Sequence, residues 1–127
     1  MRNHKAKSIL ASTAGVYSSG AEEYQDEEAP TGPVSAYAKS KLRAEQSCRA
    51  AYTQHGVPCT VLRLFNVYGP GQRPPFLVPH VVASIAADKP FKLKMPKAIR
   101  DFVFVQDVAS AFVAAVVSQD RNFRVIN

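Results

Sequence analysis

The chain of 127 residues lacks the features that mark several large classes of protein. Its two cysteines, Cys48 and Cys59, have neither the spacing of metal ligands nor the number of a disulfide framework. A reducing, cytoplasmic setting is the default expectation. No apolar run approaches the ~18 residues of a membrane span, and the polar start MRNHKAK lacks the apolar region of a signal peptide. We therefore expect no association with a membrane.

The net charge of +6 is spread unevenly along the chain. Residues 1–33 carry three basic and five acidic groups, whereas residues 34–127 carry thirteen basic and five acidic groups. A basic surface of this kind attracts anions. Because the basic residues are scattered singly and no nucleic-acid-binding motif is present, we expect no nucleic acid partner. Two interpretations of the excess positive charge remain: it attracts a small phosphorylated ligand, or it only contributes to solubility.

Short apolar segments alternate with longer segments of helix-forming residues. Strands are expected at 7–12, 59–67, 91–95, 101–105 and 123–127. Helices are expected at 36–55, capped by Ser35 and ended by Gly56, and at 76–88 and 106–119. Residues 20–34, with prolines and a cluster of acids, predict an exposed loop. This alternation predicts an α/β fold with a mainly parallel sheet and flanking helices.

The length of the chain allows one domain at most. The first expected strand lies close to the start of the sequence, and the last one runs to its end. We therefore interpret residues 1–127 as a single fragment of a larger domain.

The segment AYAKSKLRAEQ, residues 36–46, places Tyr37 four residues before Lys41. On a helix these two positions lie on the same face, within reach of each other. A nearby ammonium favours the phenolate form of a tyrosine and so makes it a better acid–base catalyst at neutral pH. Taken alone, the pair fits an active site and a solvated helix face equally well.

Further polar residues follow the expected strands at one edge of the sheet. Ser12 and Thr13 end the first strand, and Asn66 lies at the end of the second. Open α/β folds bind their ligands at this carboxyl edge. Arg100, in the segment IRDFVFVQDV, adds a fork of donors that suits phosphate oxygens. The order is a hydroxyl pair, a Tyr-x-x-x-Lys helix, an Asn at a strand end and an Arg-Asp-Phe motif.

This series resembles the extended short-chain dehydrogenase/reductase family, which includes the NAD-dependent nucleotide-sugar epimerases, dehydratases and ketoreductases. The resemblance extends from SILASTAGVY to RVIN and rests on four motifs in the same order. It implies a partial Rossmann-like fold, an NAD or NADP cofactor and a nucleotide-sugar substrate.

The resemblance also implies a role for each candidate residue. Tyr37 would be the catalytic acid/base, and Lys41 would stabilise its phenolate and hold the nicotinamide ribose. Thr13 would hydrogen-bond the reacting sugar oxygen, and the backbone of Phe65 would meet the nicotinamide.

Two further residues would contact the substrate. The resemblance places Asn66 and Arg100 against the sugar diphosphate. Many relatives have a Gly-Asp-Gly-like turn before the Arg-Asp-Phe motif, whereas this chain has MPKAI. The identity of the nucleotide and of the sugar therefore stays open.

The chain departs from the family pattern in two other respects. No segment matches the glycine-rich G-x-x-G-x-x-G turn, so the cofactor-binding N-terminal half of the family is not expected here. The related 4,6-dehydratases carry an Asp-Glu pair just after the catalytic hydroxyl. Because this chain has Ala14 and Gly15 at those positions, we do not expect it to eliminate water.

We therefore interpret the chain as part of an NAD(P)-dependent nucleotide-sugar epimerase or 4-ketosugar reductase, inactive by itself. The alternative is a truncated, non-catalytic relative that acts as a binding or oligomerisation module. Ala38, Leu42, Ala50 and Ala51 on the Tyr37 helix are small or apolar enough to cover a partner helix. A homodimer is therefore expected, and it would also cover an exposed edge of the sheet.

Overall fold

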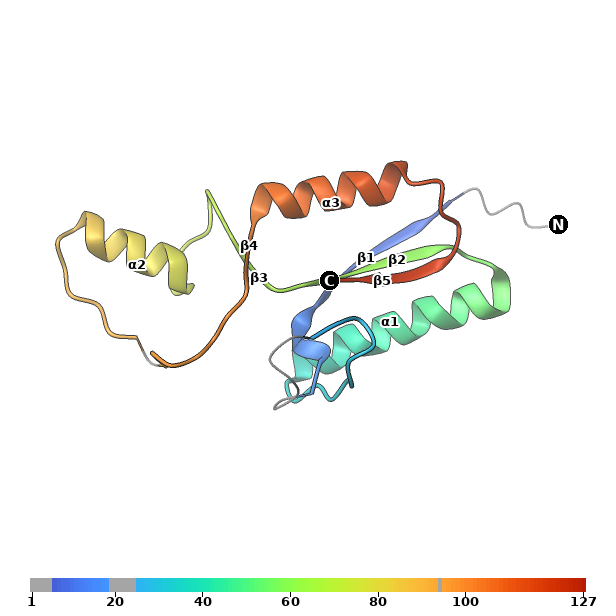
Figure 1. Ribbon diagram of the computed structural model, residues 1–127, viewed down its shortest axis with the longest axis horizontal. Coiled ribbons are helices and arrows are strands. Elements are labelled where there is room, and N and C mark those ends of the chain that lie inside the picture. The colour runs from blue at the N-terminus through green and yellow to red at the C-terminus, as the bar shows by residue number, and fades with distance from the viewer. Residues whose placement is uncertain (1–5, 19–24, 94) are drawn as a thin grey trace.

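A computed structural model of the chain describes residues 6–18, 25–93 and 95–127. Within these ranges the chain forms two parallel sheets and three α-helices (Figure 1). The first sheet contains β1 (Ser8–Thr13), β2 (Cys59–Leu64) and β5 (Phe123–Ile126), and the second contains β3 (Asn66–Tyr68) and β4 (Phe102–Phe104). The helices are α1 (Ala36–His55), α2 (Leu77–Ala86) and α3 (Val105–Val117), and a short 3-10 helix, η1 (Ala14–Val16), follows β1.

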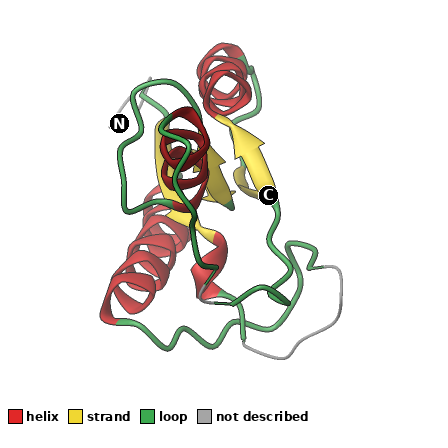
Figure 2. Ribbon diagram, turned by 90° about the vertical axis from the view of Figure 1, so that its left-hand side faces the viewer, coloured by secondary structure: helices red, strands yellow, loops and turns green. Residues whose placement is uncertain are grey.

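The three-stranded sheet has the order β1-β2-β5, and all its strands are parallel. Ser8 pairs with Cys59, which pairs in turn with Phe123. Helix α1 packs on one face of this sheet and α3 lies on the other (Figures 1 and 2). The middle strand β2 is buried along nearly its whole length, as expected of a strand covered on both faces. The predicted α/β architecture, a mainly parallel sheet with flanking helices, is confirmed.

Helix α1 begins and ends at the residues that the sequence indicates. The Ser35 side chain accepts a hydrogen bond from the backbone N–H of Ala38 at 3.0 Å, which satisfies one of the unpaired amides of the first turn. Gly56 ends the helix in the left-handed conformation, with φ of 65°. Both ends of α1 are therefore set by local capping interactions.

The loop after η1 folds back along the strands. Tyr17 and Thr31 form an antiparallel bridge, and the backbone N–H of Ser18 donates to the carbonyl of Pro30 at 2.9 Å. No helix or strand forms in the described part of the predicted loop, residues 25–34, apart from that bridge. Residues 20–24 of the prediction lie outside the described residues.

Two predicted strands differ from the structure. The segment 59–67 does not form one strand, because the chain leaves the first sheet at Phe65 and joins a second sheet as β3. The prediction of a strand at 91–95 is wrong for its described residues 91–93 and 95. Its alternating pattern has no neighbouring strand with which to pair, and Phe91, Leu93 and Met95 remain exposed.

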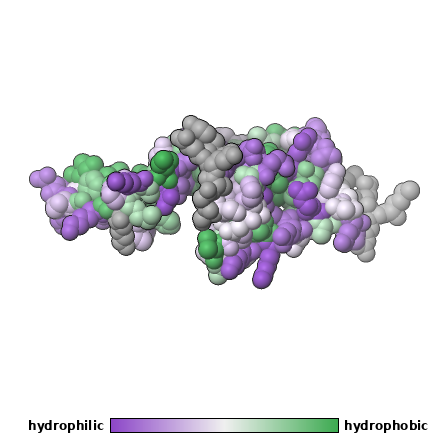
Figure 3. All heavy atoms as spheres, turned by 60° about the horizontal axis from the view of Figure 1, so that its bottom comes forward, coloured by the Kyte–Doolittle hydropathy of each residue, from purple (hydrophilic) through white to green (hydrophobic). Residues whose placement is uncertain are grey.

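Helix α2 lies away from the three-stranded sheet, beside the β3-β4 pair (Figure 1). None of its residues is buried, and Val82 and Ile85 are 60% and 67% exposed. Figure 3 shows apolar surface at this end of the molecule. Helix α2 therefore contributes little to the core, and its first turn forms part of the cavity described below.

The turn after β3 passes against the first residue of α3. Gly69 has φ of 154°, and a Cβ atom at this position would lie 2.3 Å from Cγ1 of Val105. This contact is shorter than van der Waals separation allows, so only glycine lets β3 and α3 approach so closely.

We predict that Gly69→Ala destabilises the chain by ~1–3 kcal/mol, the range for forced overpacking, beyond the backbone cost of a positive φ. Gly71→Ala is the matched control, because Gly71 also has a positive φ of 86°, but a Cβ atom added there would meet nothing within 4 Å. Urea denaturation of both variants measures the difference. If Gly69→Ala and Gly71→Ala had equal free energies of unfolding, the close approach of Val105 would not be the reason for a glycine at position 69.

Candidate active site

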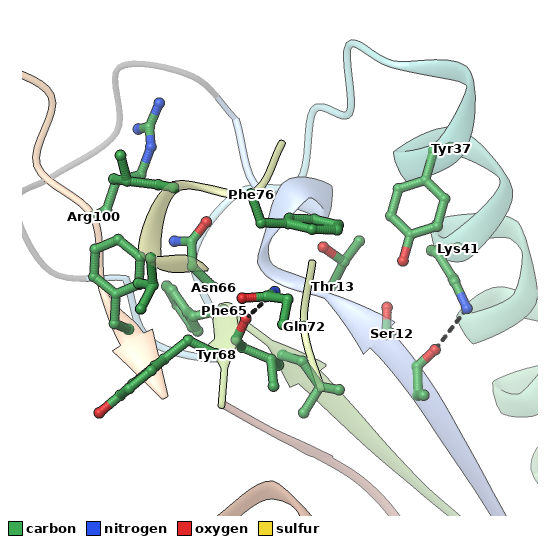
Figure 4. A pocket seen from close by; sticks show the side chains of 16 residues that line it. Ser12, Thr13, Tyr37, Lys41, Phe65, Asn66, Tyr68, Gln72, Phe76 and Arg100 are labelled. Atoms are coloured by element: carbon green, nitrogen blue, oxygen red, sulfur yellow. Dashed lines mark hydrogen bonds between the residues drawn. The ribbon is translucent and has the colours of Figure 1, made fainter. Parts of the chain in front are cut away.

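A cavity of about 460 Å³ lies at the carboxyl ends of β1 and β2 (Figure 4). Its walls come from β1, the first turns of α1, the β2–β3 connection, the turn after β3 and the start of α2. The six residues to which the sequence assigns a role line it, Thr13, Tyr37, Lys41, Phe65, Asn66 and Arg100, and so does Ser12. The structure therefore brings together side chains that are far apart in the sequence.

Tyr37 and Lys41 form one wall of the cavity. The Lys41 Nζ atom lies 5.7 Å from the centroid of the Tyr37 ring, within the range of a cation–π contact. The same ammonium donates a hydrogen bond to the backbone carbonyl of Ala11 at 2.9 Å, which ties it to β1. Tyr37 is 60% exposed, and Figure 4 shows its hydroxyl on the side of Thr13 and Lys41. The phenol is therefore open to a ligand, and the ammonium beside it is held in place.

The two hydroxyls at the end of β1 have different environments. Ser12 is 3% exposed, and its hydroxyl donates to Oε1 of Glu45 in the interior. Thr13 is half-buried, and its Oγ1 accepts a hydrogen bond from the backbone N–H of Gly15 at 3.2 Å. The proton of the Thr13 hydroxyl remains available for donation to a ligand. Of the pair, Thr13 is thus the one suited to contact a substrate.

Asn66 and Arg100 stand at the opposite side of the cavity from Tyr37 (Figure 4). The Asn66 side-chain amide donates to the carbonyl of Asp101 at 2.8 Å, which links β3 to the residue before β4. Arg100 is exposed, and its Nη1 donates to the carbonyl of Ile99 at 3.2 Å. Both residues also line a second cavity of about 950 Å³, together with Thr13 and Asp101. Arg100 therefore borders both spaces.

Sequence reasoning missed part of the cavity wall. Tyr68, Gln72 and Phe76 also line the cavity, and Gln72 is oriented by donating to the carbonyl of Val67 at 2.9 Å. These residues lie in the segment YGPGQRPPF, directly after a strand that carries a candidate residue. Their position directly after the predicted strand 59–67 could have indicated them. The direction of each side chain, however, depends on the path of the turn.

The family model described as "NAD dependent epimerase/dehydratase family" matches residues 1–127. This chain belongs to that family. UDP-glucuronate 4-epimerase of Thermodesulfobacterium geofontis is 29% identical to it, over 95% of this chain and 37% of the relative. The predicted resemblance to the extended short-chain dehydrogenase/reductase family is thereby confirmed.

Two solved structures share the fold. UDP-glucuronic acid 4-epimerase from Bacillus cereus, in complex with UDP-glucuronic acid and NAD, has a TM-score of 0.81 and 30% identity, over 94% of this chain and 38% of that one. The dTDP-glucose 4,6-dehydratase from Bacillus anthracis, in complex with NAD, has a TM-score of 0.83 and 34% identity, over 94% and 39%. The chain thus spans about two fifths of the length of these relatives. The Rossmann-like fold is confirmed, as is NAD(P) as the cofactor of the family.

Metal-binding clusters and membrane-spanning helices are absent from the described residues. These ranges contain no group of three or more His, Cys, Asp or Glu side chains that could hold a metal ion. None of the helices within them is long and apolar enough to cross a membrane.

The two cysteines do not line either cavity. Cys59 is fully buried at the start of β2, and Cys48 is half-buried on α1. Burial, together with the neighbouring Cys59 thiol, raises the pKa of Cys48 to about 11. The thiolate of Cys48 is therefore scarce at neutral pH, which makes it a poor nucleophile.

We predict slow alkylation of Cys48 by iodoacetamide at pH 8, ~100-fold slower than in the urea-unfolded chain, because the reactive thiolate is rarer by about this factor. The rate should rise with pH toward the raised pKa. Peptide mapping by mass spectrometry separates Cys48 from Cys59. Equal rates in folded and unfolded chain would contradict the assigned environment.

Proposed function

We propose that this chain forms the catalytic part of an NAD(P)-dependent nucleotide-sugar epimerase or 4-ketosugar reductase. The observation that carries the proposal is the presence of Tyr37, Lys41 and Thr13 in one cavity at the carboxyl edge of a parallel sheet. The solved relatives that contain UDP-glucuronic acid and NAD support the same reaction class.

In the proposed reaction Tyr37 is the general acid and base. Its phenolate takes the proton from a sugar hydroxyl as that carbon loses hydride, and it returns the proton when the ketone is reduced. NAD(P), when bound beside Tyr37 and Lys41, would supply the hydride acceptor and donor. Lys41, fixed by its bond to the Ala11 carbonyl, stabilises the phenolate, and Thr13 donates to the reacting oxygen. An epimerase returns the hydride to the other face of the sugar, whereas a reductase starts from a keto sugar and reduced cofactor.

The residues of this chain fit one end of the cofactor. Tyr37, Lys41 and Phe65 surround a space that suits a ribose and a nicotinamide ring. A pyrophosphate normally rests on a glycine-rich turn at a helix N-terminus. The three described α-helices instead begin after Ser35, Phe76 and Phe104. We therefore propose that the remaining contacts to the dinucleotide come from outside residues 1–127.

The substrate side favours epimerisation or reduction over dehydration. Ala14 and Gly15, which line the second cavity beside Thr13, provide no acid or base for eliminating water. Asn66 and Arg100 are suited to the sugar diphosphate, with Arg100 as the charged group. The alternative function, a non-catalytic binding or oligomerisation module, would keep the fold but would not need the open phenol of Tyr37.

We also propose a homodimer through the outer face of α1. Ala50 is exposed there, and Leu42 and Ala51 are half-buried. The expectation that Ala38 contributes is wrong, because Ala38 is 3% exposed and faces the core beside Gly15.

In the complete enzyme, Tyr37→Phe should lower kcat by ~10²–10⁴-fold, because it removes general acid–base catalysis and leaves the helix intact. Tyr52→Phe is the matched control on the same helix, since Tyr52 donates to Asn122 at 3.1 Å and does not line the cavity. Steady-state kinetics with UDP-glucuronic acid and other nucleotide sugars would measure both variants. A Tyr37→Phe enzyme as fast as the control would refute the proposed role.

The 127-residue chain alone should not bind NADH or NADPH at micromolar concentrations. The few hydrogen bonds at the nicotinamide end, each worth ~1 kcal/mol, do not offset the ordering of a large flexible cofactor. Fluorescence titration of the isolated chain with each nucleotide tests this expectation. Saturable micromolar binding would mean that the chain holds the whole dinucleotide by itself.

A further inference from the structure

A buried polar network connects the three elements that carry the proposed site. It consists of Ser12 on β1, Glu45 on α1 and Arg63 on β2, which are 3%, 4% and 6% exposed. Glu45 and Arg63 do not belong to the residues that the family resemblance singles out, whereas Ser12 is the first of the hydroxyl pair and also lines the cavity. Charged groups are costly to bury unless they are paired and hydrogen-bonded. Glu45 and Arg63 meet this condition, but their presence in the core still needs a reason.

The contacts between α1 and β2 are bidentate. Nη2 of Arg63 lies 2.8 Å from Oε2 of Glu45, and Nε lies 3.2 Å from Oε1 and 3.3 Å from Oε2. The hydroxyl of Ser12 donates to Oε1 of the same carboxylate. A shift of α1 along the sheet would break several charge-assisted hydrogen bonds at once, between side chains that are only 7% and 5% exposed.

Arg63 also holds the segment that follows η1. Its Nη1 donates to the carbonyl of Glu27 at 3.1 Å, and its guanidinium lies 4.8 Å from the centroid of the Tyr17 ring. The Tyr17 hydroxyl donates to Oδ1 of Asn127 at 2.6 Å. Burial opposes the charge of Arg63, but its hydrogen bonds with the Glu45 carboxylate outweigh this and raise the pKa of the guanidinium.

Each member of the network lies close in sequence to a site residue. Glu45 follows Lys41 by one helical turn, Ser12 immediately precedes Thr13, and Arg63 lies two residues before Phe65. From this juxtaposition we infer that Glu45 and Arg63 are positioning residues, which fix the height of Tyr37 and Lys41 on α1 relative to Thr13 on β1. The inference rests on the proposed function for its catalytic meaning, but the geometry can be tested without turnover.

An ion pair is better suited to this task than an apolar contact. Replacement of a buried ion pair by apolar side chains of similar volume is often neutral or stabilising, so stability alone does not explain the pair. Apolar burial, by contrast, is non-directional. The hydrogen bonds of the Glu45 carboxylate are directional and therefore favour one position of α1 along β1 and β2.

The central test is the paired variant Glu45→Leu with Arg63→Met, which removes both charges and keeps apolar volume. We expect it to fold cooperatively, with kcat in the complete enzyme lowered ~10–100-fold and KM changed much less, because a displacement of about an ångström has this effect on catalysis. The matched control is Arg124→Met, which breaks the exposed Arg124–Asp120 pair remote from the cavity and should leave kcat unchanged.

A second readout needs no substrate. In the 127-residue chain labelled with 3-fluorotyrosine, the ¹⁹F signal of Tyr37, assigned with Tyr37→Phe, should shift or broaden in the paired variant, while that of Tyr68 on β3 should not. Glu45→Gln, which keeps the shape and removes the charge, should give a smaller change in the same direction and serves if the paired variant does not fold.

The outcomes separate the inference from the proposed function. A folded paired variant with unchanged kcat and an unchanged Tyr37 signal would overturn the positioning role, even if Tyr37→Phe is inactive. If the paired variant does not fold, an unchanged Tyr37 signal in Glu45→Gln would overturn it equally. If Tyr37→Phe is fully active, the proposed function fails, and the ¹⁹F signals still decide whether the network sets the geometry.

Discussion

The ion pair between Glu45 and Arg63 joins the helix that carries Tyr37 to the strand that leads into Phe65. Around it, the hydroxyl of Ser12, the carbonyl of Glu27 and the ring of Tyr17 complete the contacts of the two charges. Because the pair is almost fully buried, breaking it would leave a charged group with little access to solvent, which is costly. One interaction therefore connects β1, α1, β2 and the loop after η1, and the first three of these elements contribute residues to the cavity.

The parallel sheet determines at which edge the site lies. In our inference, the network of Ser12, Glu45 and Arg63 determines the exact position of Tyr37 and Lys41 relative to Thr13. Parallel strands deliver Thr13 and Phe65 to the same edge, and α1 returns antiparallel to them so that its first turns reach that edge as well. The fold alone would tolerate small displacements of α1, which catalysis by Tyr37 would not. On the positioning role that we infer, this is the reason for two charged residues, Glu45 and Arg63, in the core.

Much of this arrangement could be predicted from local sequence. Ser35 and Gly56 mark the ends of α1 by their capping chemistry, and the spacing of Tyr37 and Lys41 places them on one helical face. What the sequence could not provide depends on contacts between distant segments. The partnership of Glu45 with Arg63 has no local signal, and the break at Phe65 reflects the second sheet rather than any breaker residue. The alternating residues at 91–95 have the pattern of a strand, but the described residues among them pair with no other strand. The local pattern therefore led to the prediction of a strand that the structure does not contain at 91–93 and 95.

The parallel pairing of the strands also governs the order in which the chain can fold. Ser8 pairs with Cys59, Cys59 with Phe123, and Asn66 with Phe102, so every described strand pair closes a long loop. Helix α1 has its own local caps and can form early, whereas the sheet must wait for the crossovers, which slows folding relative to helical proteins of similar size. During synthesis β1 leaves the ribosome well before β2 exists to pair with it. Until then, the edge of β1 that later pairs with β2 is open to other extended chains, so a high concentration of the nascent chain favours aggregation.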